Sequence, residues 1–422
     1  MRIDAGLRHE PRPGHQYNRR MLHDPARHEP LRAIRWNEAR ARAVIERIVA
    51  DTEAHFAAEG YWPLHPRDAV DGDDAPAYPL YHGAGGVVWA LHHLQARGAA
   101  KLHRDYSPWL GPLRERNTAW LAVSGEAGAD ASYLMGDTGL LLVQHAVAPA
   151  REAADRLAAL IASNIDHPAR ELMWGSPGTM LAALLMHERT GEARFADLCR
   201  ATARTLRDQL AWSAEHACHY WTQDLYGTRS TYLDAVHGFV ATASVLLRGR
   251  ALLGDEWHDV EAIVANTVRN TATLADDGGA NWRPVLEPWP GMPKLMQFCH
   301  GAPGFIIALA RMPGGMIDDL LFAAGEAVWT AGPLRKGSNL CHGTGGNGYA
   351  FLTLFARTGD SRWLDRARAF AMHGIEQTEA EARTVGRMRY SLWTGDPGYA
   401  IYLLDCMQET AGFPTLDVFF AP

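Results

Sequence analysis

The stretch that decides the fold of this chain is Asn339-Leu340-Cys341-His342-Gly343-Thr344-Gly345-Gly346, and it has a near copy upstream in Phe298-Cys299-His300-Gly301-Ala302-Pro303-Gly304. Each copy places a Cys-His pair directly before a Gly-x-x-Gly turn that opens an apolar, helix-like run. Thiolate and imidazole groups are ligands that zinc prefers in proteins. Two such pairs would supply a zinc site if the two turns meet in space.

The same turn recurs along the chain, which indicates a repeat architecture. Six copies read Gly-x-x-Gly, and the fourth ends in Ala241. We interpret the first glycine as adopting a backbone conformation that a Cβ atom would oppose. The second glycine should permit close packing in the opening turn of a helix. The seven copies begin at Gly83, Gly136, Gly175, Gly238, Gly301, Gly343 and Gly395.

An apolar helix is expected after each turn and a charged, amphipathic helix before it. The apolar helices are hydrophobic nearly all round and should be buried, with the amphipathic ones outside them. No convincing run of strands is present, so we predict an all-α fold of seven helical hairpins. The hairpins can close as an inner ring within an outer ring, or they can form an open solenoid. The expected inner helices include 140–147, 179–187, 240–248, 305–310, 349–356 and 399–404, and the expected outer helices include 37–50, 193–211, 257–274 and 361–376.

Composition places the 422-residue chain among globular proteins, with 47% apolar and 21% charged residues. A net charge of −7 argues against a nucleic-acid partner, and no apolar run is long enough for a membrane span. Five cysteines do not make a disulfide framework, and the N-terminus lacks an apolar export segment, so we expect a cytoplasmic protein with free thiols. Residues 1–32, rich in Arg, His and Pro, are expected to be an arm on the body or a disordered tail. A single domain should follow at 33–422.

The positions of Cys299, Cys341 and His342 just before their turn glycines predict these three residues as metal ligands. Catalytic zinc sites typically use three protein ligands and keep one position open. His300 either completes the site as a fourth ligand or points into the cavity. Cys218-His219 is a useful comparison, because no Gly-x-x-Gly turn follows it and it is expected to end an outer helix.

Other polar residues at the turns are candidates for proton transfer or substrate binding. His237 has no thiol neighbour, which suits a proton donor or acceptor near neutral pH. A buried structural histidine is the alternative there and the better interpretation for His82. Asp137 is either functional or a carboxylate that interacts with a helix dipole. The basic residues before the sixth and seventh turns can bind an anionic group or remain surface charges, and they are Arg335, Lys336, Arg383, Arg387 and Arg389.

At these residues the chain resembles the lanthionine synthetase C-like family. The chain is more similar to the free-standing, eukaryotic-type members than to peptide-antibiotic cyclases. Phe298 stands where the family usually has Trp, and Leu295 where many bacterial cyclases carry Arg, which weakens the case for lanthipeptide cyclisation. The resemblance is carried by residues 294–304, 334–343, 347–354, 235–238 and 391–395.

The resemblance implies an α/α toroid of seven repeats and a zinc ion held by Cys299, Cys341 and His342. The implied reaction is a Michaelis-type addition of a Cys or glutathione thiol to dehydroalanine or dehydrobutyrine residues of a peptide or protein, which gives a thioether. Lys336 and Arg383 match glutathione-contacting positions, the latter after a one-residue shift. We expect a separate dehydratase or kinase to supply the dehydrated substrate.

We expect His237 to protonate the product of this addition, with Asp137 and His300 as further catalytic candidates. Two other functions remain open. One is a non-catalytic scaffold or regulatory protein that binds zinc and glutathione. The other is a prenyltransferase-like zinc enzyme that alkylates thiols, although such sites use a carboxylate, a Cys and a His.

Overall fold

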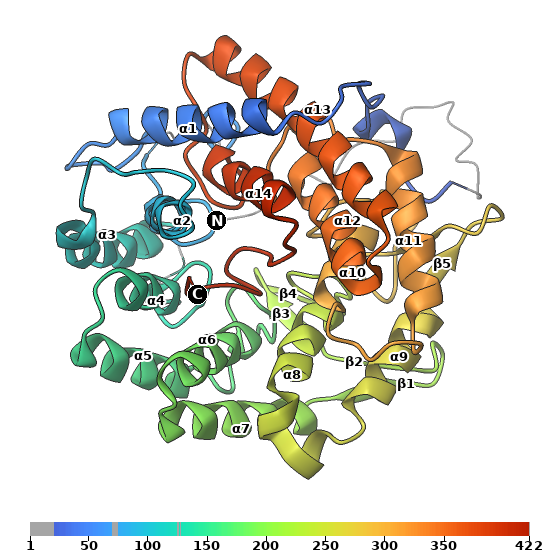
Figure 1. Cartoon of the computed structure of the whole chain (residues 1–422). Helices are drawn as coiled ribbons and strands as arrows, with labels where there is room; N and C mark the ends of the chain where they lie inside the picture. The colour runs from blue at the N-terminus through green and yellow to red at the C-terminus, as the bar shows by residue number, and fades with distance from the viewer. Residues whose placement is uncertain (1–20, 70–74, 125, 127, 422) are drawn as a thin grey trace.

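Seven helical hairpins form two concentric rings in the computed structural model of this chain, which describes residues 21–69, 75–124, 126 and 128–421 (Figure 1). The inner ring consists of α2 (Ala84–Ala96), α4 (Asp137–Val147), α6 (Ser176–Thr190), α8 (Phe239–Leu253), α10 (Ala302–Ala308), α12 (Thr344–Thr358) and α14 (Asp396–Gln408). The outer ring consists of α1 (Glu38–Ala54), α3 (Leu110–Val123), α5 (Arg151–Ser163), α7 (Ala193–Asp208), α9 (Val260–Thr271), α11 (Asp318–Ala331) and α13 (Ser361–Val385). The predicted all-α toroid with inner and outer helices is confirmed.

The ring is closed, which the repeat pattern alone did not decide. The last inner helix, α14, contacts both the first inner helix, α2, and its preceding neighbour, α12. The first outer helix, α1, packs against α14 and α13. The two ends of the repeat array therefore cover each other, and neither end exposes an apolar face.

Three short antiparallel hairpins depart from the prediction that no strands occur. They pair β1 (Ala211–Ser213) with β2 (Cys218–Tyr220), β3 (Gln223–Leu225) with β4 (Thr228–Ser230), and β5 (Ala272–Leu274) with β6 (Ala280–Trp282). Strands of three residues are too short to show an alternating pattern. The expectation that Cys218-His219 ends an outer helix is wrong, because α7 stops at Asp208 and Cys218 pairs with Ser213 in a hairpin.

The glycines of each turn are required by packing more than by backbone dihedral angles. Gly343 has a φ of −118°, which any residue can adopt, but a Cβ atom there would lie 2.5 Å from the carbonyl oxygen of Gly337. Gly301, with a φ of 117°, is the exception among the seven. At the second glycine the expected close packing is present, because a Cβ at Gly346 would lie 1.9 Å from the carbonyl oxygen of Leu340.

A belt of backbone hydrogen bonds joins the seven turns. The N–H two residues before one turn glycine typically donates to the equivalent carbonyl of the next turn. Thus Cys299 donates to Cys341 at 3.0 Å, Cys341 donates to Trp393 at 2.8 Å, and Trp393 donates to Tyr81 at 3.1 Å across the closure of the ring. Among the described residues, five of the seven neighbouring pairs of turns are joined in this way, and the Leu172 N–H, one residue earlier, joins the third turn to the fourth. The fourth and fifth turns lack such a bond. The belt fixes the turns, and hence their side chains, at one mouth of the ring.

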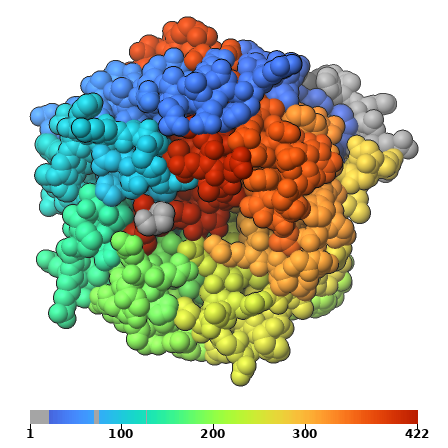
Figure 2. Space-filling model, in the orientation of Figure 1, coloured from blue at the N-terminus to red at the C-terminus, as the bar shows by residue number. Residues whose placement is uncertain are grey.

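The C-terminal segment, residues 409–421, follows the C-terminal end of α14, which is the end away from the seventh turn. The segment runs into the centre of the ring (Figures 1 and 2). Phe413 stacks on Phe298 with a ring separation of 4.2 Å. The Arg248 guanidinium donates to the carbonyls of Leu416 and Asp417 at 2.9 and 3.1 Å. The segment therefore packs directly beneath the turn that carries Cys299.

The described part of the predicted N-terminal arm, from residue 21, lies on the body of the protein. His28 forms an antiparallel bridge with Leu334, and Leu22 is 8% exposed. Residues 1–20 lie outside the described residues. No helix in the described ranges combines the length and apolarity needed to cross a membrane.

Candidate metal centre and proton-transfer site

Cys299, Cys341 and His342 converge at the mouth of the ring. One ligand atom from each lies within 4.8 Å of the other two. Donor atoms around one tetrahedral zinc ion lie roughly 3–4 Å apart, so these three residues are close enough to share one ion. The fifth and sixth turns bring the residues together, because they begin α10 and α12 and share the Cys299–Cys341 backbone hydrogen bond. Two sulfurs and one imidazole fit zinc.

Each cysteine sulfur has a polar neighbour that the sequence pattern did not identify. The Tyr81 hydroxyl donates to the Cys341 Sγ at 3.0 Å, and the Gln297 amide nitrogen donates to the Cys299 Sγ at 3.0 Å. The hydrogen bond from Cys299 lowers the pKa of Cys341 against the effect of burial, with help from Tyr81 and from the charge of Lys336. Burial raises the pKa of Cys299 well above its usual value.

His237 is held by a buried carboxylate. Its Nδ1 lies 2.8 Å from an oxygen of Glu171, whose side chain is completely buried. Backbone N–H groups of Met173, Trp174 and Gly175 donate to the same carboxylate at 2.9, 2.5 and 3.2 Å. Because Glu171 occupies Nδ1, Nε2 is the atom that can exchange a proton with a substrate. Burial opposes the charged ring, but the hydrogen bond and charge of Glu171 prevail and raise the pKa of His237.

His300 has an equivalent partner in Asp234. The His300 Nδ1 lies 2.8 Å from one oxygen of the buried Asp234 carboxylate, while the other oxygen accepts from the N–H groups of Val236 and His237. Asp234 raises the pKa of His300 despite burial of the ring. The rings of His237 and His300 have centroids 6.4 Å apart. The two histidines thus stand side by side, each oriented by its own carboxylate.

A repeat rule would have found these carboxylates. Glu171 and Asp234 both lie four residues before a turn glycine, and each contacts the histidine that directly precedes the next turn glycine. Gln297 occupies the same position before the fifth turn. Tyr81 in the first turn occupies the position that Cys299 takes in the fifth. The signal that identifies them is the position of each acidic, amide or phenol side chain relative to the turn glycine, in addition to the positions of Cys, His and Gly.

The other predicted residues lie in different surroundings. The Asp137 carboxylate is 3.5 Å from Arg114 and 3.2 Å from Arg156, which belong to the outer helices α3 and α5. His82 is buried, and burial lowers its pKa to about 4. Lys336 is partly exposed beside the sixth turn, with its charge within reach of Cys341. Arg383 is exposed on the last turn of α13.

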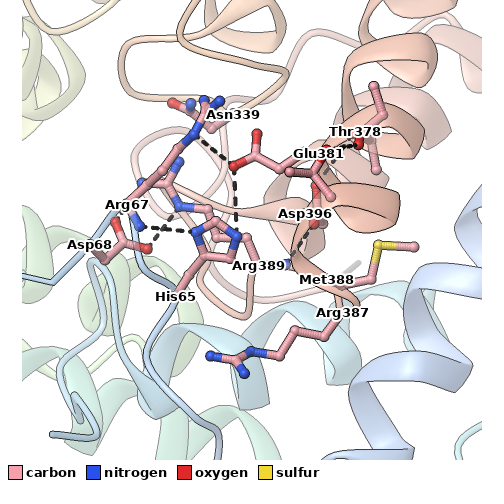
Figure 3. Close-up of polar contacts among 12 residues, drawn as sticks. His65, Arg67, Asp68, Asn339, Thr378, Glu381, Arg387, Met388, Arg389 and Asp396 are labelled. Carbon is pink, nitrogen blue, oxygen red and sulfur yellow. Dashed lines mark hydrogen bonds and ion pairs between the residues drawn. The ribbon is translucent and has the colours of Figure 1, made fainter. Parts of the chain in front are cut away.

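The remaining basic residues near the seventh turn are mostly engaged within the protein. Figure 3 shows Arg389 facing Asp68, a buried ion pair with one separation of 2.8 Å, and His65 beside Glu381. Glu381 also pairs with Arg67 at 2.8 Å. These contacts tie the segment after α1 to the end of α13 next to the sixth turn.

Comparison with known proteins gives one family. The family described as lanthionine synthetase C-like protein matches residues 77–418. The chain is 26% identical over 317 residues to glutathione S-transferase LANCL1 of Danio rerio, covering 68% of this chain and 74% of the relative. It is 31% identical over 210 residues to LanC-like protein GCL1 of Arabidopsis thaliana, covering 48% and 46%. The solved structure of a nisin cyclase has the same fold, with a TM-score of 0.57 at 13% identity, covering 89% of this chain and 96% of the cyclase.

Proposed function

Because this chain belongs to the lanthionine synthetase C-like family, we propose that it catalyses zinc-dependent addition of a thiol to dehydroalanine or dehydrobutyrine residues of a peptide or protein. The observation that carries the proposal is the convergence of Cys299, Cys341 and His342 beside two carboxylate-held histidines. Thiol chemistry in the family is represented by the zebrafish relative, which is named a glutathione S-transferase.

Cys299, Cys341 and His342 would hold the metal, and their donor atoms suit zinc better than magnesium or calcium, which prefer oxygen. Zinc with an open coordination position would lower the pKa of an incoming thiol and so supply thiolate near neutral pH. Hydrogen bonds from Tyr81 and Gln297 disperse negative charge on the two protein sulfurs. Such partners orient ligands and tune the affinity of a site.

In the addition, the substrate sulfur bonds to the β carbon of the dehydro-residue, and the electrons of the double bond move toward the α carbon and its carbonyl. The thiol proton leaves to solvent when the thiolate forms, and His237, protonated at Nε2, delivers a proton to the α carbon. One S–H bond and the C=C π bond are thus replaced by one S–C and one C–H bond, and His237 regains its proton from solvent. Glu171 keeps the Nδ1 proton in place and stabilises the imidazolium. His300, 6.4 Å away between ring centroids, is the second donor to the developing negative charge.

Glutathione is the thiol that we propose, with Lys336 and Arg383 as its carboxylate-binding residues. Lys336 adjoins the sixth turn, and its charge acts on Cys341. A separate dehydratase or kinase would supply the dehydrated substrate. We place the reaction in the cytoplasm, where thiols remain reduced, in keeping with five free cysteines. Asp137 remains a catalytic prediction, although its two arginine partners favour a structural role.

The test is to incubate the zinc-loaded protein with glutathione and a dehydroalanine peptide, and to follow the mass increase of the peptide. We expect adduct formation above the uncatalysed rate and a 10²–10⁴-fold loss in His237→Ala, the range for removal of a general acid. Zinc binding without any rate enhancement would refute catalysis and support the scaffold function. Zinc retained in full by Cys299→Ala would instead support a prenyltransferase-like ligand set.

A further inference from the structure

The segment 21–29, called the clamp here, lies across the chain that leads into both cysteine turns. On the side of the fifth turn, the Asp24 N–H donates to the Lys294 carbonyl at 3.2 Å. The Lys294 ammonium in turn donates to the Met21 carbonyl at 2.5 Å. Residues 294–297, which we call the fifth stem, lead directly to Cys299. The clamp therefore holds this stem at Lys294, by one backbone–backbone and one side-chain–backbone hydrogen bond.

The other edge of the clamp holds the stem of the sixth turn, residues 332–335. His28 bridges Leu334, the Glu29 N–H donates to the Pro333 carbonyl at 2.9 Å, and the Arg335 N–H donates to the Arg27 carbonyl at 3.0 Å. His28 is 5% exposed, so this contact is buried. One short segment thus joins two stems that are about 40 residues apart in sequence and that carry the two sulfurs.

A side chain of the clamp also reaches the sulfur of Cys299 through one intermediate. The Arg27 Nη2 donates to Gln297 Oε1 at 3.3 Å, and Gln297 Nε2 donates to the Cys299 Sγ at 3.0 Å. A guanidinium has only donors, so it holds the Gln297 oxygen toward itself and turns the amide N–H groups toward the sulfur. Its positive charge also polarises the amide, which strengthens the hydrogen bond to a thiolate in this buried place.

We propose that residues 21–29 are a structural part of the metal centre. The clamp sets the spacing of the two cysteine turns, and Arg27 positions Gln297 as the hydrogen-bond donor to the Cys299 sulfur. Neither Arg27 nor Gln297 contacts a substrate in this assignment; both act through a ligand. The inference rests on the proposed zinc site.

The experiment compares zinc affinity by chelator competition in the full-length protein, its Arg27→Met and Gln297→Glu variants, and the control Arg32→Met. Arg32 follows the clamp, but its side chain is 54% exposed and pairs with Glu376 at 3.1 Å. We expect about 10–100-fold weaker zinc binding in Arg27→Met and Gln297→Glu, as for other residues that support metal ligands. Arg32→Met should bind like the wild type, and Arg27→Lys, which restores a cationic donor, should recover part of the loss.

The cobalt-substituted proteins provide a second readout that a loss of stability alone would not move. The thiolate-to-cobalt absorption should shift in Gln297→Glu because the hydrogen bond to the Cys299 sulfur is removed, and the far-UV circular dichroism should stay that of the wild type. Zinc affinity and absorption equal to the wild type in both variants would overturn the clamp assignment and leave the proposed function intact. A wild-type protein that binds no zinc would overturn the proposed function and the clamp assignment with it.

Discussion

Neutralising Glu171 should move the pH range in which this protein works. The carboxylate accepts from His237 Nδ1 at 2.8 Å with no exposure to solvent, and it raises the pKa of that ring above the usual value of 6.5. A hydrogen bond to a charged group contributes about 1.5–3 kcal/mol. Glu171→Gln should therefore lower the pKa of His237, because the hydrogen bond and the charge that stabilise the protonated ring are removed.

The sign of the effect on rate follows from the role of His237 as proton donor. The protonated ring exists below its pKa, so activity falls as the pH rises through that value. In Glu171→Gln this descending limb should move to lower pH, which makes the variant about 10–100-fold slower above the limb, as a loss of about 1.5–3 kcal/mol predicts, and close to the wild type well below it. The ascending limb, which belongs to the thiol, should stay in place.

The same substitution affects stability in a defined direction. Because the folded pKa of His237 is raised, the ion pair stabilises the fold fully below pH 6.5, and that contribution is lost as the pH rises through the folded pKa. The difference in melting temperature between wild type and Glu171→Gln should therefore shrink at alkaline pH.

The assay is the initial rate of glutathione addition to a dehydroalanine peptide from pH 5 to 9, with circular dichroism to check the fold. Asp405→Asn is the matched control, since it neutralises a buried carboxylate on α14 that pairs with Arg97 instead. An unmoved descending limb in a folded Glu171→Gln protein would refute the assignment of His237, held by Glu171, as the proton donor.

Further predictions concern the metal, the turns and Asp137. Cys341→Ala should lose bound zinc in elemental analysis, whereas Cys218→Ala should retain it, because Cys218 lies in the β1–β2 hairpin. Gly346→Ala should lower the free energy of unfolding by about 1–3 kcal/mol, since its Cβ would meet the Leu340 carbonyl, and a denaturant titration measures this. Asp137→Asn should lower the melting temperature, because two arginines lose their partner, and should leave the rate of addition within about twofold of the wild type. A large loss of rate without a change in melting temperature would support a catalytic role for Asp137.

The repeat of a glycine turn was enough to predict the fold and the convergence of Cys299, Cys341 and His342, while their role as metal ligands stays a prediction. Every repeat places its turn at the same mouth of the ring, so residues just before the turn glycines lie close together in space. Cys299, Cys341 and His342 could therefore be grouped from the sequence alone. Closure of the ring could not be predicted in this way, because the contact of α14 with α2 depends on small rotations accumulated over seven repeats.

The parts that escaped prediction have common physical causes. Glu171 and Asp234 act across a repeat boundary, so each looks like an isolated acidic residue until the histidine of the next turn is placed beside it. The strands of the Cys218 hairpin have three residues each, which is too few to show the alternation of polar and apolar residues that distinguishes a strand from a helix. The approach of Arg27 to Gln297 joins residues 270 positions apart, a separation at which no local pattern exists.

In the belt of backbone hydrogen bonds around the mouth, the fourth and fifth turns are the one neighbouring pair of described turns that no such bond joins. We call this place the joint. There the Asp234 carboxylate contacts His300 at 2.8 Å, and the backbone joins the two repeats just before the turns, where Leu233 donates to Pro284 and Leu286 donates to Thr231. Separation of these two turns would break the imidazole–carboxylate contact, and the backbone hydrogen bonds beside it would limit how far the turns move. Cys299 lies on the fifth turn, which borders this joint, but its backbone bond to Cys341 links that turn to its other neighbour, so a movement at the joint would leave the spacing of the two sulfurs unchanged.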